Sequence, residues 1–249
     1  MPVDIDRQDQ IGIITFRREE KRNAIDAEMT TAIDEALNAF EEDDALRVCV
    51  LTGGKRVFCA GTDLGGGSGL GTERGGEYGI IRRRCNKPLI AAIEGIAFGG
   101  GLEIALCCDM IVAASDARLG LPEVSRGVVA TSAGLFRAPR SLPLNVAREL
   151  LLTGDPIDAD RAERVGLVNR VTEPGGALAG AIELAKRVAR NSPVSIRETL
   201  RAIDATVSAD DALGWEATDT AREAVQSGED IGEGIRAFFE KREPNWPKR

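Results

Sequence analysis

Residues 87–113 read KPLIAAIEGIAFGGGLEIALCCDMIVA. The run PLIAAI at 88–93 is short and apolar, which is typical of a buried strand. A glycine cluster follows at 99–101, residues 102–108 predict a helix, and 109–114 and 117–120 predict further strands. This close succession of strand, helix and strand predicts an α/β core in which helices cover the strands.

The same alternation continues on the N-terminal side. IGIITFR at 11–17 and RVCVLT at 47–52 predict strands. Between them, residues 26–42 predict an amphipathic helix because Met29, Ile33 and Leu37 recur at helical spacing. Asp26 is the expected N-cap of this helix.

The C-terminal side is different, because helical patterns dominate from about residue 145. They cover 145–152, 158–165, 176–190 and 194–207, and a charged tail follows over 209–242; only 167–171 predicts another strand. The tail carries scattered apolar residues, so we expect it to pack on the core or against another subunit.

Composition excludes several kinds of chemistry. The 249 residues contain no histidine, which excludes Ser-His-Asp and Cys-His triads, HExxH zinc sites and every imidazole base. Carboxylates, cysteine, lysine, tyrosine and backbone amides remain available. The formal net charge of −8 argues against general nucleic-acid binding.

The expected compartment is the cytoplasm. The opening residues MPVDIDRQDQ lack the apolar core of a signal peptide, and the five cysteines contain no CxxC pair. The longest apolar stretch, 89–114, is interrupted by Glu94, Glu103 and Asp109, so we do not expect it to span a membrane.

Two glycine-rich segments call for different interpretations. GGGSGLG at 65–71 lacks the GKS or GKT of a P-loop and does not join a strand to a helix, so we interpret this run as a flexible lid or spacer. Gly99 to Gly101 instead precede a predicted helix with Glu103 in its first turn. Backbone amides at such a helix start can stabilise an enolate oxygen, although the glycines can equally serve tight packing.

Two further segments add candidates for the same cleft. FCAGTDL at 58–64 follows a predicted strand and can supply a second backbone amide. Leu121-Pro122-Glu123 places a carboxylate 20 residues beyond Glu103, which leaves enough chain to return to the cleft. An acidic residue behind an N1 proline is also a common helix start, so Glu123 has a purely structural alternative.

Together these segments resemble the enoyl-CoA hydratase/isomerase (crotonase) family. The resemblance runs in order along nearly the whole chain: KRNA at 21–24, LTGG at 51–54, FCAGTDL at 58–64, the stretch 87–113, LGLPEVSRGVV at 119–129, LLLTGDPIDADRAERVGLVNRV at 150–171 and FFEKREP at 238–244. It implies a spiral of β-β-α units over residues 1–190. It also implies a helical C-terminal segment over 191–249 that builds trimers or dimers of trimers.

The resemblance also implies the chemistry: hydration of a 2-enoyl-CoA to a 3-hydroxyacyl-CoA in lipid metabolism, with no metal and no redox cofactor. Family roles carried over to this chain put the oxyanion-binding amides at Ala60 and Gly100. They make Glu103 the residue that orients and deprotonates water and Glu123 the acid/base at Cα. Retention of both glutamates favours a hydratase over an isomerase.

For coenzyme A, the resemblance points to the FCAGTDL segment and to basic residues. The residues implied are Arg22, Ala24, Ala60, Gly61, Thr62, Asp63, Leu64 and Lys241, the last sometimes acting on a neighbouring subunit. The run Arg82-Arg83-Arg84 is a further candidate for the phosphates, but we favour its interpretation as a solvated helix face.

Two departures from the family pattern bear on the substrate. Many hydratases have a lysine where this chain has Gly65, and the usual GxxPxxGG segment reads GVVATSAG at 127–134. The acyl group is therefore left open by the sequence. A Δ3-Δ2 enoyl-CoA isomerase that uses Glu123 alone and a non-catalytic acyl-CoA-binding protein are the alternatives.

Overall fold

The computed structural model describes residues 1–66, 69, 71–228 and 230–246. Within these residues the strands form two sheets, one of six strands in the order β1-β2-β3-β4-β6-β9 and one of three in the order β5-β7-β8. The larger sheet contains β1 (Val3–Gln8), β2 (Ile11–Phe16), β3 (Val48–Thr52), β4 (Leu89–Ile93), β6 (Met110–Ala114) and β9 (Arg170–Thr172). The smaller contains β5 (Ile96–Phe98), β7 (Arg118–Gly120) and β8 (Ile157–Asp158).

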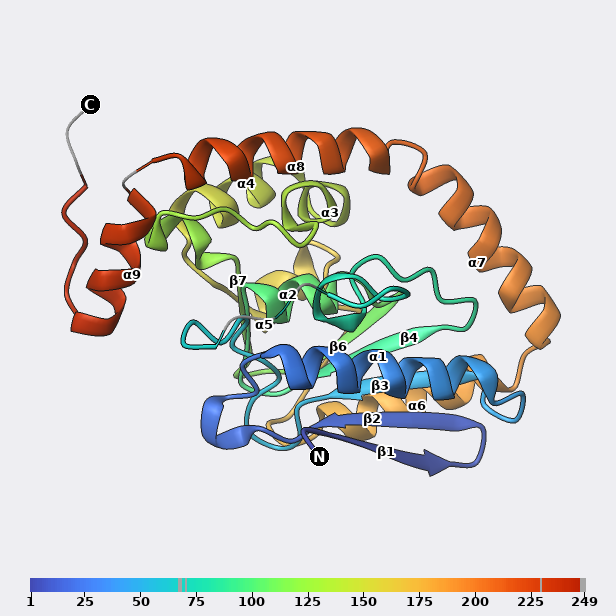
Figure 1. The fold of residues 1–249 in the computed structure, drawn as a ribbon. Helices are drawn as coiled ribbons and strands as arrows, with labels where there is room; N and C mark the ends of the chain where they lie inside the picture. Colours follow the sequence, from blue (N-terminus) through green and yellow to red (C-terminus); the bar gives the residue numbers. More distant parts are fainter. Residues whose placement is uncertain (67–68, 70, 229, 247–249) are drawn as a thin grey trace.

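Helices cover both faces of the larger sheet and form the C-terminal part (Figure 1). The described α-helices are α1 (Ala27–Glu42), α2 (Gly100–Ala105), α3 (Gly134–Ser141), α4 (Leu144–Thr153), α5 (Ala159–Arg164), α6 (Ala177–Ala189), α7 (Pro193–Val207), α8 (Asp211–Gln226) and α9 (Asp230–Glu240). Short 3₁₀ helices are η1 (Glu19–Lys21), η2 (Glu77–Gly79) and η3 (Pro122–Arg126). In Figure 1 the chain from α7 to α9 arches over the core.

Two successive turns confirm the expected β-β-α spiral. The chain runs from β4 in the larger sheet to β5 in the smaller sheet and on into α2. It then repeats the path through β6, β7 and η3. Because β4 pairs in parallel with β6, and β5 with β7, each turn stacks on the one before it. The helical starts after β5 and β7 therefore emerge at the same edge of the small sheet.

Burial explains the elements that the sequence predicts well. In α1 the Asp26 side chain accepts a hydrogen bond from the Met29 N–H, and the apolar face with Ile33 and Leu37 is fully buried. On the opposite face of the sheet, alanines of α6 pack on Val50, Ile90 and Val112 among other strand residues. Small side chains let this helix lie close to the strands.

One prediction about the segment after β3 is wrong. Arg82 to Arg84 form no helix. The Arg83 side chain is only 2% exposed and pairs with Asp34 at 2.5 Å and with Glu41. Earlier in the same loop, Gly79 packs closely against α1, where a Cβ on it would lie 2.3 Å from the Thr30 carbonyl oxygen. Residues 67, 68 and 70 of this loop lie outside the described part.

Strand β1 and helix α3 are absent from the sequence-based prediction. Within β1 only Val3 is buried, and Ile5 on the same face is half exposed, so the hydrophobic signal of the strand is weak; its antiparallel ladder with β2 makes it regular. Helix α3 contains Pro139, which argues against a helix on sequence grounds. In the described residues no helix is both long and apolar enough to cross a membrane.

Candidate active site

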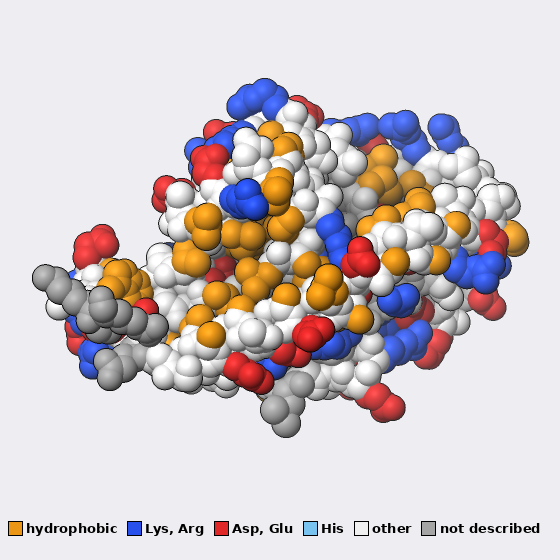
Figure 2. All heavy atoms as spheres, turned by 90° about the horizontal axis from the view of Figure 1, so that it is seen from above, with side chains coloured by type: hydrophobic (Ala, Val, Ile, Leu, Met, Phe, Trp, Pro, Cys, Tyr) orange, Lys and Arg blue, Asp and Glu red, His pale blue; other side chains and the backbone are white. Residues whose placement is uncertain are grey.

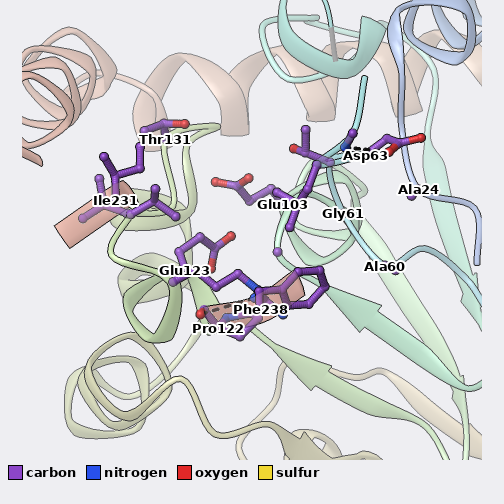
Figure 3. A pocket seen from close by; sticks show the side chains of 18 of the residues that line it. Ala24, Ala60, Gly61, Asp63, Glu103, Pro122, Glu123, Thr131, Ile231 and Phe238 are labelled. Atoms are coloured by element: carbon purple, nitrogen blue, oxygen red, sulfur yellow. Dashed lines mark hydrogen bonds between the residues drawn. The ribbon is translucent and has the colours of Figure 1, made fainter. Parts of the chain in front are cut away.

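A cavity of about 490 Å³ opens where the helical starts α2 and η3 meet the loop after β3 and the C-terminal helices. It is lined by the segments 21–24, 60–65, 99–103 and 122–131, by Tyr78, and by parts of α8 and α9. Figure 3 shows Glu103 and Glu123 side by side in it, with Ala24, Ala60 and Asp63 on one side and Thr131 and Ile231 on the other.

Glu103 is held by backbone amides. It lies in α2, and its side chain is almost fully buried, at 2% exposed. Its Oε1 atom accepts hydrogen bonds from the N–H groups of Ser132 at 2.8 Å and Gly134 at 3.0 Å. A Cβ on Gly134 would lie 2.9 Å from the same oxygen, so the close approach requires glycine. One carboxylate oxygen is thus anchored, and Oε2 is left for other partners.

The Glu123 carboxyl group has fewer hydrogen-bond partners than that of Glu103. It is in the first turn of η3 behind Pro122, and its Oε1 atom lies where a Cβ on Gly99 would be only 3.0 Å away. Its Oε2 atom is buried and has no hydrogen-bond partner among the residues that the structure describes. A buried polar atom without a partner is costly, and such atoms are typical of groups that exchange protons with a ligand.

The two carboxyl groups form an electrostatically coupled pair. Burial raises the pKa of Glu103 well above its ordinary value, and the charge of Glu123 raises it further. Burial also raises the pKa of Glu123, while Arg126 opposes that shift. Near neutral pH the pair therefore holds a proton that exposed glutamates would have lost.

The backbone N–H groups of the loop 60–63 differ in whether they have a hydrogen-bond acceptor. The Ala60 N–H donates to the Arg22 carbonyl at 3.0 Å and the Asp63 N–H donates to Ile25 at 2.9 Å. The Gly61 N–H donates to Cys59 Sγ at 3.3 Å. The N–H groups of Thr62 and of Gly100, at the start of α2, have no acceptor among the described residues.

The sequence and structure comparisons agree on one family. The family model described as Enoyl-CoA hydratase/isomerase matches residues 6–249. The chain belongs to this enoyl-CoA hydratase/isomerase family.

Its relatives in the family include several hydratases and dehydratases. The chain is 39% identical to the mevalonyl-coenzyme A hydratase of Aspergillus fumigatus, over 95% of this chain and 91% of that protein. It is 33% identical to the short-chain-enoyl-CoA hydratase of Clostridium acetobutylicum, over 96% and 94%. The structure of a carnitinyl-CoA dehydratase from Mycobacterium avium superposes with a TM-score of 0.93 at 39% identity, covering 100% of this chain and 99% of that one.

The structure brings most of the residues expected from the family resemblance to one cavity. Those that line it are Arg22, Ala24, Ala60, Gly61, Thr62, Asp63, Leu64, Gly100, Glu103 and Glu123. Lys241 is exposed and does not line it. Asp63 pairs with Arg18 at 3.2 Å, and hydrogen bonds from the Gly65 amide and Arg18 lower its pKa.

The departures from the family pattern gain a physical meaning. The unusual segment 127–134 contains the two amides that hold Glu103, so it supports the carboxyl group through its backbone although its side chains differ. Gly65 lines the cavity where many hydratases have lysine, and Lys21 also lines it.

Sequence reasoning missed several lining residues. The missed residues include Lys21, Tyr78, Arg126, Thr131, Ile231 and Phe238. Lys21 belongs to the same KRNA motif as Arg22, so the motif itself indicates it. Arg126, Thr131 and Phe238 also lie in segments that correspond to the family pattern, whereas Tyr78 and Ile231 lie in none of them. No group of three or more His, Cys, Asp or Glu side chains suited to a metal ion occurs in the described part.

Proposed function

We propose that this protein is a hydratase or dehydratase of CoA thioesters, which interconverts a 2-enoyl-CoA and a 3-hydroxyacyl-CoA. The observation that carries the proposal is the pair Glu103 and Glu123 in one cavity, together with the Thr62 and Gly100 N–H groups, which have no acceptor in the described part of the chain. An isomerase that moves a double bond with one acid has no need of a second carboxyl group opposite the first.

The oxyanion site in this proposal consists of the Thr62 and Gly100 N–H groups. The family resemblance points to Ala60 for this role, but the Ala60 N–H already donates to the Arg22 carbonyl oxygen. As water adds to the double bond, negative charge develops on the thioester oxygen, and each preorganised amide is worth about 3 kcal/mol to that charge. The Gly100 amide lies close to Glu103 along α2, because Gly100 precedes it by less than one helical turn.

The two carboxyl groups supply the protons. Glu103, with Oε1 anchored, presents Oε2 to a water molecule and takes its proton as the oxygen bonds to Cβ of the acyl chain. Glu123 gives its proton to Cα. The net addition is one water across the double bond, and in dehydration the two groups exchange roles. Burial raises the pKa of both groups, so near neutral pH the pair retains one proton to share between the two carboxyl groups.

The acyl group is identified by assay. Wild type is incubated with crotonyl-CoA, a longer 2-enoyl-CoA, carnitinyl-CoA and mevalonyl-CoA, and the conjugated thioester absorbance is followed as it is lost or gained. Turnover of one of these substrates is the expected result. Binding of acyl-CoA without turnover would instead support a carrier, and conversion of a 3-enoyl-CoA alone would support the isomerase.

The pH profile of kcat/KM is expected to be bell-shaped. Hydration fails at low pH because Glu103 becomes protonated, and at high pH because Glu123 loses its proton. Since burial raises both pKa values, both limbs lie above the ordinary glutamate pKa of about 4.3. Rates measured between about pH 5 and about pH 10 test this expectation. An acid limb at the position of an exposed carboxyl group would contradict it.

We further propose that residues 191–249 mediate assembly into trimers or dimers of trimers. Helix α7 buries none of its residues and exposes Val194, Ile203 and Val207. Figure 2, which views the molecule from the side of α8, shows hydrophobic side chains gathered across this face.

Substitution of Ile203 by aspartate is expected to reduce the mass of the assembly in light scattering, because a charge would be buried in the interface. Ile5→Asp is the matched control, since both isoleucines are 50% exposed and Ile5 is on the edge strand β1. Equal masses for wild type and Ile203→Asp would refute the role of α7.

A further inference from the structure

The single tyrosine of the chain, Tyr78, lies in the cavity although it is remote in sequence from both glutamates. It belongs to η2, and its side chain is 6% exposed. A Cβ on Gly100 would lie 2.7 Å from both its Oη atom and its ring, so the phenol packs directly on the residue that supplies one proposed oxyanion amide.

The backbone around Tyr78 is unusual. Tyr78 has a φ of +54°, a left-handed conformation that non-glycine residues rarely adopt. A Cβ on Gly75 would lie 1.9 Å from the Gly79 carbonyl oxygen, and one on Gly79 would lie 2.3 Å from the Thr30 carbonyl oxygen. These glycines bring the loop onto α1 and direct the phenol into the cavity. Strained backbone of this kind concentrates at functional sites.

The Tyr78 hydroxyl group connects two loops of the site. It makes a 2.8 Å hydrogen bond with Thr62 Oγ1, in the loop that carries the other proposed oxyanion amide. It also interacts with the side chain of Ser132, whose backbone N–H donates to Glu103. Burial and then the charge of Glu103 raise the pKa of Tyr78 far above its ordinary value, so the phenol keeps its proton.

We propose that Tyr78 is a positioning residue, whose hydroxyl group fixes the Thr62 loop relative to the Ser132 loop and thereby sets the distance between the oxyanion site and the Glu103 carboxyl group. The inference rests on the proposed function. A displacement of about 1 Å between reacting groups can cost orders of magnitude in rate, so a rigid link between these loops serves the chemical step rather than substrate binding.

Tyr78→Phe is the direct test, because it removes only the hydroxyl group and keeps the ring. We expect kcat to fall about tenfold, as for loss of one well-placed hydrogen bond, while KM stays within about twofold of wild type. Thr62→Val is expected to have a similar effect. The double variant should lose no more than either single variant, because both break the same link. Thr218→Val, which removes another buried hydroxyl group outside the cavity, is the matched control.

Three outcomes would overturn the inference: a Tyr78→Phe protein with wild-type kcat, a loss confined to KM, or losses that add in the double variant. If Tyr78→Phe does not fold, Ser132→Ala carries the test with the same expected fall in kcat. A wild type that converts no CoA thioester refutes the proposed function and this inference together. An active wild type with an equally active Tyr78→Phe refutes this inference alone.

Discussion

Replacing Glu123 by glutamine is expected to lower kcat for hydration of a 2-enoyl-CoA by a factor of about one hundred or more, because in the proposed mechanism the amide cannot deliver a proton to Cα. We expect Glu103→Gln to have an effect of the same size, since the remaining oxygen can still accept the Ser132 amide but the proposed base that removes a proton from water is lost. KM changes less than kcat in both variants. The rates are followed by the loss of thioester absorbance.

Glu94→Gln is the control for this pair. Glu94 is 4% exposed and accepts two backbone N–H groups, from Gly175 at 2.9 Å and Ala177 at 2.8 Å, much as Glu103 does, but it does not line the cavity. Its substitution therefore shows how much activity is lost when a buried, amide-bound glutamate that takes no part in proton transfer is replaced. If Glu103→Gln loses no more activity than Glu94→Gln, the two-carboxyl mechanism is wrong.

The second large effect is expected at Gly61, where alanine would obstruct the oxyanion site. A Cβ on Gly61 would lie 3.1 Å from the Gly100 amide nitrogen and 2.8 Å from the Phe98 carbonyl oxygen. We expect Gly61→Ala to lower kcat about a hundredfold or more, comparable to losing one oxyanion donor. The measurement is kcat with the substrate that wild type converts best, together with the thermal midpoint of each variant.

Backbone strain alone must be separated from this obstruction. Gly61 has a φ of +95°, so alanine is strained there in any case. Gly166→Ala provides the comparison, because Gly166 has a φ of +85° and its added Cβ would meet nothing within 4 Å. We expect a lower thermal midpoint for both variants but a large loss of kcat for Gly61→Ala alone. Normal turnover in a folded Gly61→Ala protein would place the oxyanion site elsewhere.

The sequence predicts those elements in which local pattern and tertiary packing agree. Helix α1 is one, because its cap at Asp26 and its apolar face are both visible in the residues themselves. Strands β3 and β4 are others, since both are buried along their whole length and therefore read as continuous apolar runs. Strand β1 depends on its partner β2, so its own residues carry little signal.

The site is predictable as a set of segments but not as a set of atoms. The motif FCAGTDL identifies the loop, yet which amide is free depends on acceptors at Arg22 and Ile25, which lie elsewhere in the chain. Similarly, the position of Tyr78 depends on where the neighbouring glycines let the loop approach α1. Contacts between distant segments decide both features, and no spacing rule encodes them.

The way in which Glu103 is held also bears on how new substrate ranges arise. Its two donors are main-chain groups of Ser132 and Gly134, whereas Val128, Val129 and Thr131 of the same segment line the cavity with their side chains. Mutations at these three positions can therefore reshape the acyl chamber while the proton-transfer apparatus persists. Such modularity makes the segment a natural target for directed evolution, in which acceptance of bulkier or more polar acyl groups is selected without rebuilding the catalyst.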